Sequence, residues 1–247
     1  MGGVSAVIAA VDEAATLRQV LAQVHRLGVT EVVLVANGPG EEAARVAAGA
    51  GARVVRYREP VGHDVGRALG GIHAEGDTLL FLDADMPVPA EDLRPFLQAV
   101  RDGVDVALNR LDLYIRPEAR LHPVNAAKRF LTAVLGRPDL GCASLTAVPH
   151  ALSRRALNVL GAGALAVPPL AFARAVAAGL RVEAVHPVDA VRLNARRPGL
   201  NLGRSSPVEQ LILGDHLEAI AWVQARAEDP RAGLTDLGRR RDLLPPP

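Results

Sequence analysis

The stretch Thr78-Leu-Leu-Phe-Leu-Asp-Ala-Asp-Met-Pro-Val-Pro-Ala90 is a short apolar segment that ends in two carboxylates. The apolar run before the acids is typical of a strand buried on both faces, as in a parallel sheet. The two prolines stop that strand, and the acidic residues after Ala90 favour the start of a helix. Asp83 and Asp85 are therefore predicted to lie at the carboxyl end of a central strand, the edge at which open α/β sheets bind their ligands.

The spacing of Asp83 and Asp85 suits a cation site. Hard divalent ions such as Mg²⁺ and Mn²⁺ favour oxygen ligands, and one or two carboxylates often join such an ion to substrate phosphates. The alternative is structural, with Asp83 capping the following turn and Asp85 solvated. The pair alone is a weak pattern, but its position after a buried strand favours the binding site.

Strand-like and helix-like segments alternate through the first half of the chain. This order predicts right-handed crossovers and a mostly parallel sheet flanked by helices, which is an α/β fold. Apolar runs predict strands over residues 4–10, 31–36, 53–57, 78–83 and 105–108, and helical spacing predicts helices over 14–27, 41–48, 64–73 and 91–100.

The second half is less regular. The stretch 111–123, with two prolines, is interpreted as a long functional loop or lid, and 194–207, rich in Arg, Asn, Gly and Ser, as a mobile segment. Residues 228–247 are expected to be a disordered tail, so that a single domain spans 1–227. The remaining segments are predicted to be helices over 124–135, 153–160, 170–178 and 208–227, and strands over 143–148 and 181–185.

Composition argues against several classes of protein. The 247 residues suit one large domain, and an aromatic content of 3% with a formal net charge of +1 argues against a nucleic-acid surface. Cys142 is the only cysteine, which excludes an internal disulfide and a multi-cysteine metal site. No apolar run reaches the length of a transmembrane segment and the start lacks a signal peptide's basic residues, so we expect a cytoplasmic protein.

Polar residues also follow two earlier strands. Asp12 and Glu13 come after the first strand, and Asn37 and Gly38 come after the second. Since the carboxyl ends of neighbouring parallel strands meet at one edge, these residues are expected to line a crevice with the two aspartates. Asp12 and Asn37 carry oxygens that accept the N–H donors of a nucleobase. The alternatives are an N-cap for Asp12 and a turn for Asn37 and Gly38.

Four segments together resemble the successive blocks of the family 2 glycosyltransferases, which have the GT-A fold. The resemblance implies transfer of a sugar from a nucleotide-diphosphate donor, a divalent metal on the diphosphate, and inversion at the anomeric carbon. It also implies that residues 1–110 bind the nucleotide sugar and residues 111–227 the acceptor. The four segments are Val4-Ser-Ala-Val-Ile-Ala-Ala-Val-Asp-Glu13, Val33-Leu-Val-Ala-Asn-Gly38, Gly62-His-Asp-Val-Gly-Arg-Ala68 and Gly76-Asp-Thr-Leu-Leu-Phe-Leu-Asp-Ala-Asp85.

The resemblance assigns roles to residues of this sequence. Arg67 would face a phosphate of the donor, with a place on a helix surface as the alternative. Asp85 would bind Mn²⁺ or Mg²⁺, with Asp83 and His186 as further ligands. The donor would be linked to UDP or GDP, the acceptor is unknown, and a homodimer is left open. The expected donor-binding residues are Ala10, Asp12, Glu13, Asn37, Gly38, Gly66, Arg67, Asp83 and Ala84.

One part of the family pattern is missing. Many members carry an acidic pair for the catalytic base in the second half, whereas residues 164–172 contain no carboxylate. Asp189 is the candidate base, since an inverting transfer needs a group that takes the proton of the acceptor hydroxyl. Otherwise the acceptor is already ionised, or the chain is a non-catalytic nucleotide-sugar-binding or partner protein. A sugar-1-phosphate nucleotidyltransferase fits less well, because residues 9–18 offer a single arginine for a triphosphate.

Overall fold

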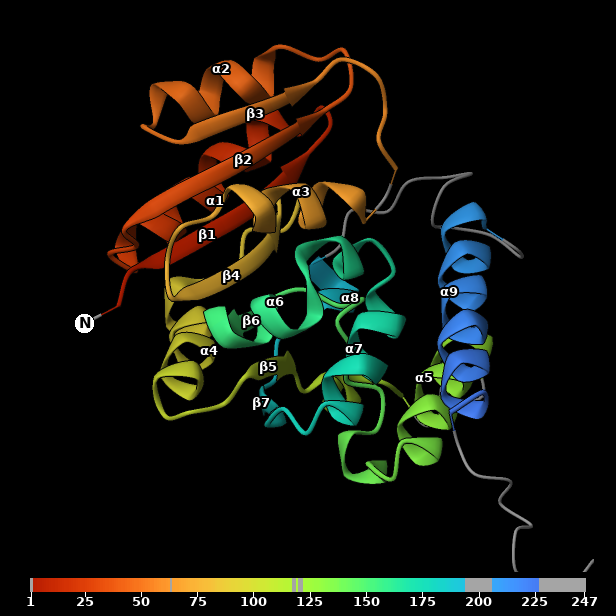
Figure 1. The fold of residues 1–247 in the computed structure, drawn as a ribbon. Coiled ribbons are helices and arrows are strands. Elements are labelled where there is room, and N and C mark those ends of the chain that lie inside the picture. Colours follow the sequence, from red (N-terminus) through yellow and green to blue (C-terminus); the bar gives the residue numbers. More distant parts are fainter. Residues whose placement is uncertain (1, 63, 117–118, 120–121, 194–205, 227–247) are drawn as a thin grey trace, which may run out of the picture.

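The computed structural model describes residues 2–62, 64–116, 119, 122–193 and 206–226. Within these residues, seven strands form one sheet in the order β3-β2-β1-β4-β6-β5-β7 (Figure 1). All neighbouring strands run parallel except at β6, which is antiparallel to both β4 and β5. The predicted α/β fold with a mostly parallel sheet is confirmed. The strands are β1 (Val4–Ala10), β2 (Glu31–Asn37), β3 (Arg53–Tyr57), β4 (Thr78–Asp83), β5 (Val106–Asn109), β6 (His150–Ser153) and β7 (Val182–His186).

Helices cover both faces of the sheet (Figure 1). In the first half, each helix connects two strands, as the alternating pattern predicted. They are α1 (Ala14–Arg26), α2 (Glu42–Gly49), α3 (Val65–His73) and α4 (Ala90–Arg101). The second half holds α5 (Pro123–Val134), α6 (Arg154–Leu160), α7 (Pro168–Ala177), α8 (Ala190–Leu193) and α9 (Pro207–Gln224), with short 3₁₀ turns at η1 (Leu111–Tyr114), η3 (Pro138–Leu140) and η4 (Ala162–Ala166).

The centre of the sheet is formed by β1 and β4, which lie side by side in parallel register. Ile8, Leu80 and Phe81 are completely buried there. Because helices cover both faces, every side chain of these strands meets apolar neighbours, which explains the unbroken apolar runs in the sequence. The register places Ala9 beside Asp83, so both strands end at the same edge.

Two glycines bring α3 close to the sheet. A Cβ atom at Gly70 would lie 2.2 Å from a methyl group of Val7, and one at Gly66 would lie 3.1 Å from the Cβ of Ala9. These separations leave no room for a larger residue at Gly70 and little at Gly66. The close approach sets α3 directly above β1, with Arg67 between the two glycines.

The strand predicted at 143–148 is wrong. That segment forms turns, and the strand follows it as β6. The hydroxyl groups of Ser144 and Thr146 lie 2.8 Å apart, and the Ser144 hydroxyl accepts the backbone N–H of Thr146. Such local bonds offer the backbone an alternative to a sheet ladder. The change of position matters, because the turn at 144–148 reaches the carboxyl edge of the sheet.

The last helix, α9, buries only part of its apolar side chains. Ala219 and Ile220 of α9 are buried, whereas Leu211 and Leu217 are 43% and 64% exposed. The helix lies against α5 and α7, along the second half of the molecule (Figure 1). None of the described helices has the length and apolarity needed to cross a membrane. Most of the segment 194–207 and all of the tail 228–247 lie outside the described residues.

Candidate active site

A cavity of about 230 Å³ opens at the carboxyl edge of the sheet, where β1, β2 and β4 end. The turn before β6 and the first half of α9 close its other side. The strand ends therefore supply most of the polar groups, and both halves of the chain contribute to the apolar wall. The lining residues include Ala9, Ala10, Val11, Glu13, Asn37, Gly62, Arg67, Asp83, Ala84, Asp85, Met86, Thr146, Ala147, Val148, Val208 and Ile212.

The segment after β4 is held in a tight turn. The backbone N–H of Ala84 donates to the carbonyl of Ala9 at 3.2 Å, and that of Met86 donates to the carbonyl of Asp83 at 3.3 Å. These bonds fix Asp83 and Asp85 at the end of the strand, where both line the cavity. The sequence prediction for the position of the two acids agrees with this arrangement.

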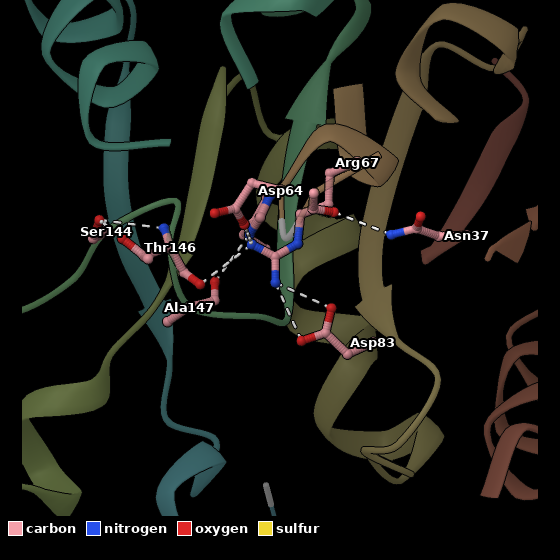
Figure 2. A network of polar contacts seen from close by, with 9 residues as sticks. Asn37, Asp64, Arg67, Asp83, Ser144, Thr146 and Ala147 are labelled. Carbon is pink, nitrogen blue, oxygen red and sulfur yellow. Dashed lines mark hydrogen bonds and ion pairs between the residues drawn. The ribbon is translucent and has the colours of Figure 1, made fainter. Parts of the chain in front are cut away.

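Arg67 is the centre of the polar network in Figure 2. Its guanidinium group donates to Asp64 at 2.6 Å and to both carboxylate oxygens of Asp83 at 3.0 and 3.2 Å. It also donates to the backbone carbonyl of Thr146 at 3.4 Å. One side chain of α3 therefore connects the end of β4 with the turn before β6. The predicted alternative, a charge on a helix surface, does not apply, because Arg67 is only 5% exposed.

Burial and charge act in opposite directions on Arg67. Burial alone lowers the pKa of its guanidinium group, but the nearby carboxylates of Asp83 and Asp64 outweigh that effect and raise the pKa. The arginine is thus a fixed positive charge below the cavity. Its Nε atom is buried and has no hydrogen-bond partner, which is unusual for a buried polar group. Asp83 is one-third exposed and links this charge to the cavity.

A neutral histidine supports the far wall of the cavity. His150 is 1% exposed, its ring stacks on Phe81 with centroids 5.0 Å apart, and its Nδ1 lies 2.9 Å from the carbonyl of Ala147. Burial, together with the positive charge of Arg67, lowers the pKa of His150 to about 3. The imidazole is therefore uncharged at neutral pH, and it fixes the turn that carries Thr146 and Ala147.

The Asn37 side chain is engaged by the neighbouring loop. Its oxygen accepts the backbone N–H of Val61 at 2.7 Å, and its nitrogen donates to the carbonyl of Gly62 at 3.1 Å. Asn37 still lines the cavity. Gly38, with φ of 117°, makes the turn that directly follows β2. The sequence suggested either a ligand contact or a turn at these two positions, and the observed bonds give both residues a structural part.

Asp12 and Glu13, both expected to bind the donor, differ in their relation to the cavity. The Glu13 carboxylate turns back and accepts the backbone N–H groups of Val11 and Asp12 at 2.7 and 3.0 Å, and Glu13 lines the cavity. Asp12 is exposed and is not among the lining residues. The N-cap of α1 is Glu13, so the predicted cap at Asp12 is wrong. Gly66 also lies outside the lining, and its place against Ala9 explains the glycine by packing.

His186 is not brought to the aspartate pair. Its strand, β7, stands three places from β4 in the sheet, about 14 Å at a spacing of about 4.8 Å per strand. The imidazole Nε2 lies 3.2 Å from Asp92 of α4, and the ring meets the edge of Phe96. In the part of the chain that the structure describes, no three His, Cys, Asp or Glu side chains are grouped to hold a metal ion.

Asp189 is bonded as a helix cap. Its carboxylate accepts the backbone N–H of Arg192 at 3.0 Å, at the start of α8. Asn109, completely buried, holds the preceding loop by exchanging two hydrogen bonds of 2.9 Å with the backbone of Val188. Asp189 is not among the residues that line the cavity. These contacts give it a structural role at the end of β7.

The sequence did not reveal the other members of the site. Asp64 lies three residues before Arg67, a spacing that allows contact on a helix, but nothing in the sequence indicates that it shares the arginine with Asp83. Thr146, Val208 and Ile212 carry no motif. They belong to the wall from the second half of the chain, whose position depends on how α9 and the turn before β6 fold back.

Comparison with protein families agrees with this geometry. The model of "Glycosyl transferase family 2" matches residues 5–160, well over half of the chain. The chain belongs to the family 2 glycosyltransferases. The matched region contains all strand ends that meet at the cavity, with Arg67, Asp83 and Asp85. The predicted family is confirmed, and a search of curated protein sequences finds no match.

The fold of this glycosyltransferase is similar to that of solved glycosyltransferase structures. Glucosyl-3-phosphoglycerate synthase from Mycobacterium tuberculosis, crystallised with Mn²⁺, UDP and glucosyl-3-phosphoglycerate, aligns with a TM-score of 0.61 and 22% identity, over 91% of this chain and 80% of that one. The same enzyme crystallised with Mg²⁺ and UDP aligns with a TM-score of 0.61 and 21% identity, over 91% and 79% of the two chains. This similarity supports the GT-A fold.

Proposed function

We propose that this glycosyltransferase moves a sugar from a UDP- or GDP-linked donor to an acceptor, with inversion at the anomeric carbon and with the help of Mn²⁺ or Mg²⁺. The observation that carries the proposal is the position of Asp83 and Asp85, which follow a central strand and line the cavity in a member of this family. The similar synthase was crystallised with UDP-glucose, UDP, Mn²⁺ and Mg²⁺, which supports this choice of donor and ion.

The donor set fits a hard divalent cation. Such ions take oxygen ligands and usually join one or two carboxylates to substrate phosphates. Asp85 would hold the ion. Asp83 would contribute one of its two carboxylate oxygens, both of which also accept hydrogen bonds from Arg67. When bound, the ion neutralises the diphosphate as it leaves the sugar. His186 lies on the distant strand β7, where its imidazole contacts Asp92 of α4, so we do not include it among the ligands.

The remaining lining residues suggest how the donor is oriented. Ala10 and Ala84 have small side chains, which allow a flat ring or a ribose to approach the backbone at the ends of β1 and β4. Arg67 holds Asp83 in place at the cavity, where its carboxylate would accept hydrogen bonds from sugar hydroxyl groups. The apolar side chains Val208 and Ile212 exclude water from the side opposite the strand ends.

A nucleotide-binding experiment tests the proposal. We expect UDP or GDP to bind with Mn²⁺ in isothermal titration calorimetry, and Asp85→Asn to weaken the binding at least about tenfold, or about 1.4 kcal/mol. Asp102→Asn is the matched control, because Asp102 is the C-cap of α4, does not line the cavity, and has a carboxylate that accepts a hydrogen bond from the Gln98 side chain. The proposal fails if neither nucleotide binds, or if binding ignores both the metal and the Asp85 substitution.

A second function, a nucleotide-sugar binder without transfer, is favoured by one observation. In the described part of the chain, the acids that line the cavity are Glu13, Asp83 and Asp85. The Glu13 carboxylate accepts two backbone N–H groups of the preceding residues and Asp83 is bonded to Arg67, which leaves neither well placed as a base. Release of free sugar or transfer from UDP-glucose by the intact chain, abolished by Asp85→Asn, would exclude the binder. Tight nucleotide binding with no turnover would support it.

A further inference from the structure

A second hollow lies at the opposite end of α9, between that helix, the end of α6 and the end of α7. It has a volume of about 410 Å³. Trp222 lies ten residues beyond Ile212, about 15 Å along the helix axis at about 1.5 Å per residue, so this hollow is separate from the sugar-transfer cavity. The residues that line it are Val159, Leu160, Arg174, Ala177, Ala178, Trp222 and Arg226.

Two guanidinium groups share one aromatic ring in this hollow. The central carbon of Arg226 lies 4.3 Å from the centre of the Trp222 ring, and that of Arg174 lies 5.8 Å from it. Both distances are within the range of a cation–π contact. The indole of α9 thus contacts two arginines from different segments, Arg174 of α7 and Arg226 of the turn that follows α9.

The charged residues of the described chain that line this hollow are both arginines, Arg174 and Arg226. No acidic residue of the described chain lines it. Elsewhere, exposed arginines pair with carboxylates, as Arg181 does with Glu183 at 2.7 Å. Two like charges in one concave site repel each other, and an anion bound between them would offset that repulsion. The arrangement is therefore complementary to a ligand that carries more than one acceptor oxygen.

We propose that this hollow is a binding site for a small phosphate-bearing molecule. A guanidinium group presents two parallel N–H donors that match two oxygens of a phosphate, and a phosphate has enough oxygens to engage two arginines together. A single carboxylate has two oxygens and satisfies one arginine. The aromatic ring between the arginines limits their rotation, so little conformational freedom is lost when the anion binds.

The chain carries its own reporter for this site, because Trp222 is its only tryptophan. Sodium phosphate is added to the intact protein at constant ionic strength, balanced with sodium chloride. Tryptophan emission is followed with excitation at a wavelength that tyrosine does not absorb. We expect a saturable change with phosphate, a weaker one with sodium acetate and none with chloride. A change that does not saturate, or that is equal for chloride, overturns the site.

Matched variants locate the response. Arg226→Gln should weaken the phosphate response at least tenfold, and Arg226→Lys, which keeps the charge but loses the fork, should weaken it less. Arg94→Gln should leave the response unchanged. Arg94 is an exposed arginine of α4 that pairs weakly with Glu91, at 3.7 Å. Asp85→Asn should also leave it unchanged, so this result does not depend on the sugar-transfer proposal. An unaltered response in Arg226→Gln, or a lost response in Asp85→Asn, would overturn the assignment.

Discussion

The two edges of the sheet use partly buried acids in different ways. At the amino edge, Glu31 accepts hydrogen bonds from the Ser5 hydroxyl and from the backbone N–H groups of Glu75 and Gly76. At the carboxyl edge, Asp83 binds a buried arginine and is one-third exposed to the cavity. The first carboxylate is enclosed by its own chain, while the second faces both the protein and the cavity.

Asp105 follows the pattern of the amino edge. It accepts from the Ser153 hydroxyl at 2.9 Å, from Arg155 at 2.6 Å and from the backbone N–H of Arg181 at 3.0 Å. Such acids join loops and are satisfied by groups within the fold. At the carboxyl edge, the Nε atom of Arg67 has no partner. The contrast indicates that fully bonded acids hold the sheet together, and that the less satisfied edge is arranged for a ligand.

Replacing an arginine at each edge is the strongest test of this contrast. Arg67→Met should lower the free energy of unfolding by about 3–5 kcal/mol, because Asp64, whose side chain is 2% exposed, would keep a buried negative charge. Arg155→Met should cost less than about 1 kcal/mol, because Arg155 is 65% exposed. Urea denaturation measures both. Asp64→Asn added to Arg67→Met should recover part of the loss, and equal losses for the two single variants would remove the contrast.

The pH dependence of stability tests the buried histidine near the carboxyl edge. The pKa of His150 is about 3 in the folded chain and 6.5 when unshifted, so only the unfolded chain takes up this proton between those values. Stability should therefore fall below pH 6.5 by up to about 1.4 kcal/mol per pH unit from this group.

The variant His150→Phe keeps the ring against Phe81 but does not titrate. Its free energy of unfolding, measured in urea from pH 7 to pH 4, should fall less steeply than that of the parent chain. His25→Phe, at an exposed position of α1, serves as the control and should follow the parent slope. Parallel slopes for the parent and His150→Phe would contradict the assignment of the acid sensitivity.

Glu31 tests the amino edge. Burial raises its pKa, but the hydrogen bonds from Ser5, Glu75 and Gly76 together outweigh burial, and the net pKa lies below 4.5. Glu31→Gln should cost about 1–2 kcal/mol at neutral pH. The difference from the parent should disappear as the pH falls through the lowered pKa, because the stabilising form is the carboxylate. Nucleotide binding should stay unchanged, and a loss of binding would show that this edge also serves the ligand.

Asp189 should give the smallest effect. It lies toward the carboxyl edge, but its carboxylate accepts a backbone N–H, as the acids of the amino edge do. Asparagine caps helices as well as aspartate, so Asp189→Asn should change stability by less than about 0.5 kcal/mol and leave sugar transfer near the parent rate. A loss of transfer of about 100-fold or more, with stability unchanged, would restore the sequence-based prediction of a catalytic base.

The sequence predicted the first half of the fold well, because its central strands are buried on both faces and leave continuous apolar runs. It also predicted the edge at which Asp83 and Asp85 meet, since strand direction follows from the alternating order. Lateral position was harder. His186 was expected near the pair because it ends a strand, but only the order of strands in the sheet shows that it is three places away.

Other differences arise from contacts that no local pattern records. The turn at 144–148 depends on hydroxyl groups that compete with strand pairing, although its residues have apolar neighbours in sequence. Arg67 appeared equally suited to a phosphate and to a helix surface. Its actual place between Asp64 and Asp83 follows from the close approach of α3 to β1, which Gly66 and Gly70 permit.

The insertion of β6 has a consequence for any attempt to divide the molecule. Residues 150–153 fill the position between β4 and β5, so the strands made by the first 110 residues do not pair into one continuous sheet on their own. A fragment ending there would expose the unpaired backbone edge of β4. Such an edge pairs with other chains, so we expect the fragment to aggregate. The segments before and after residue 110 therefore share one sheet, and we expect them to fold as one cooperative unit.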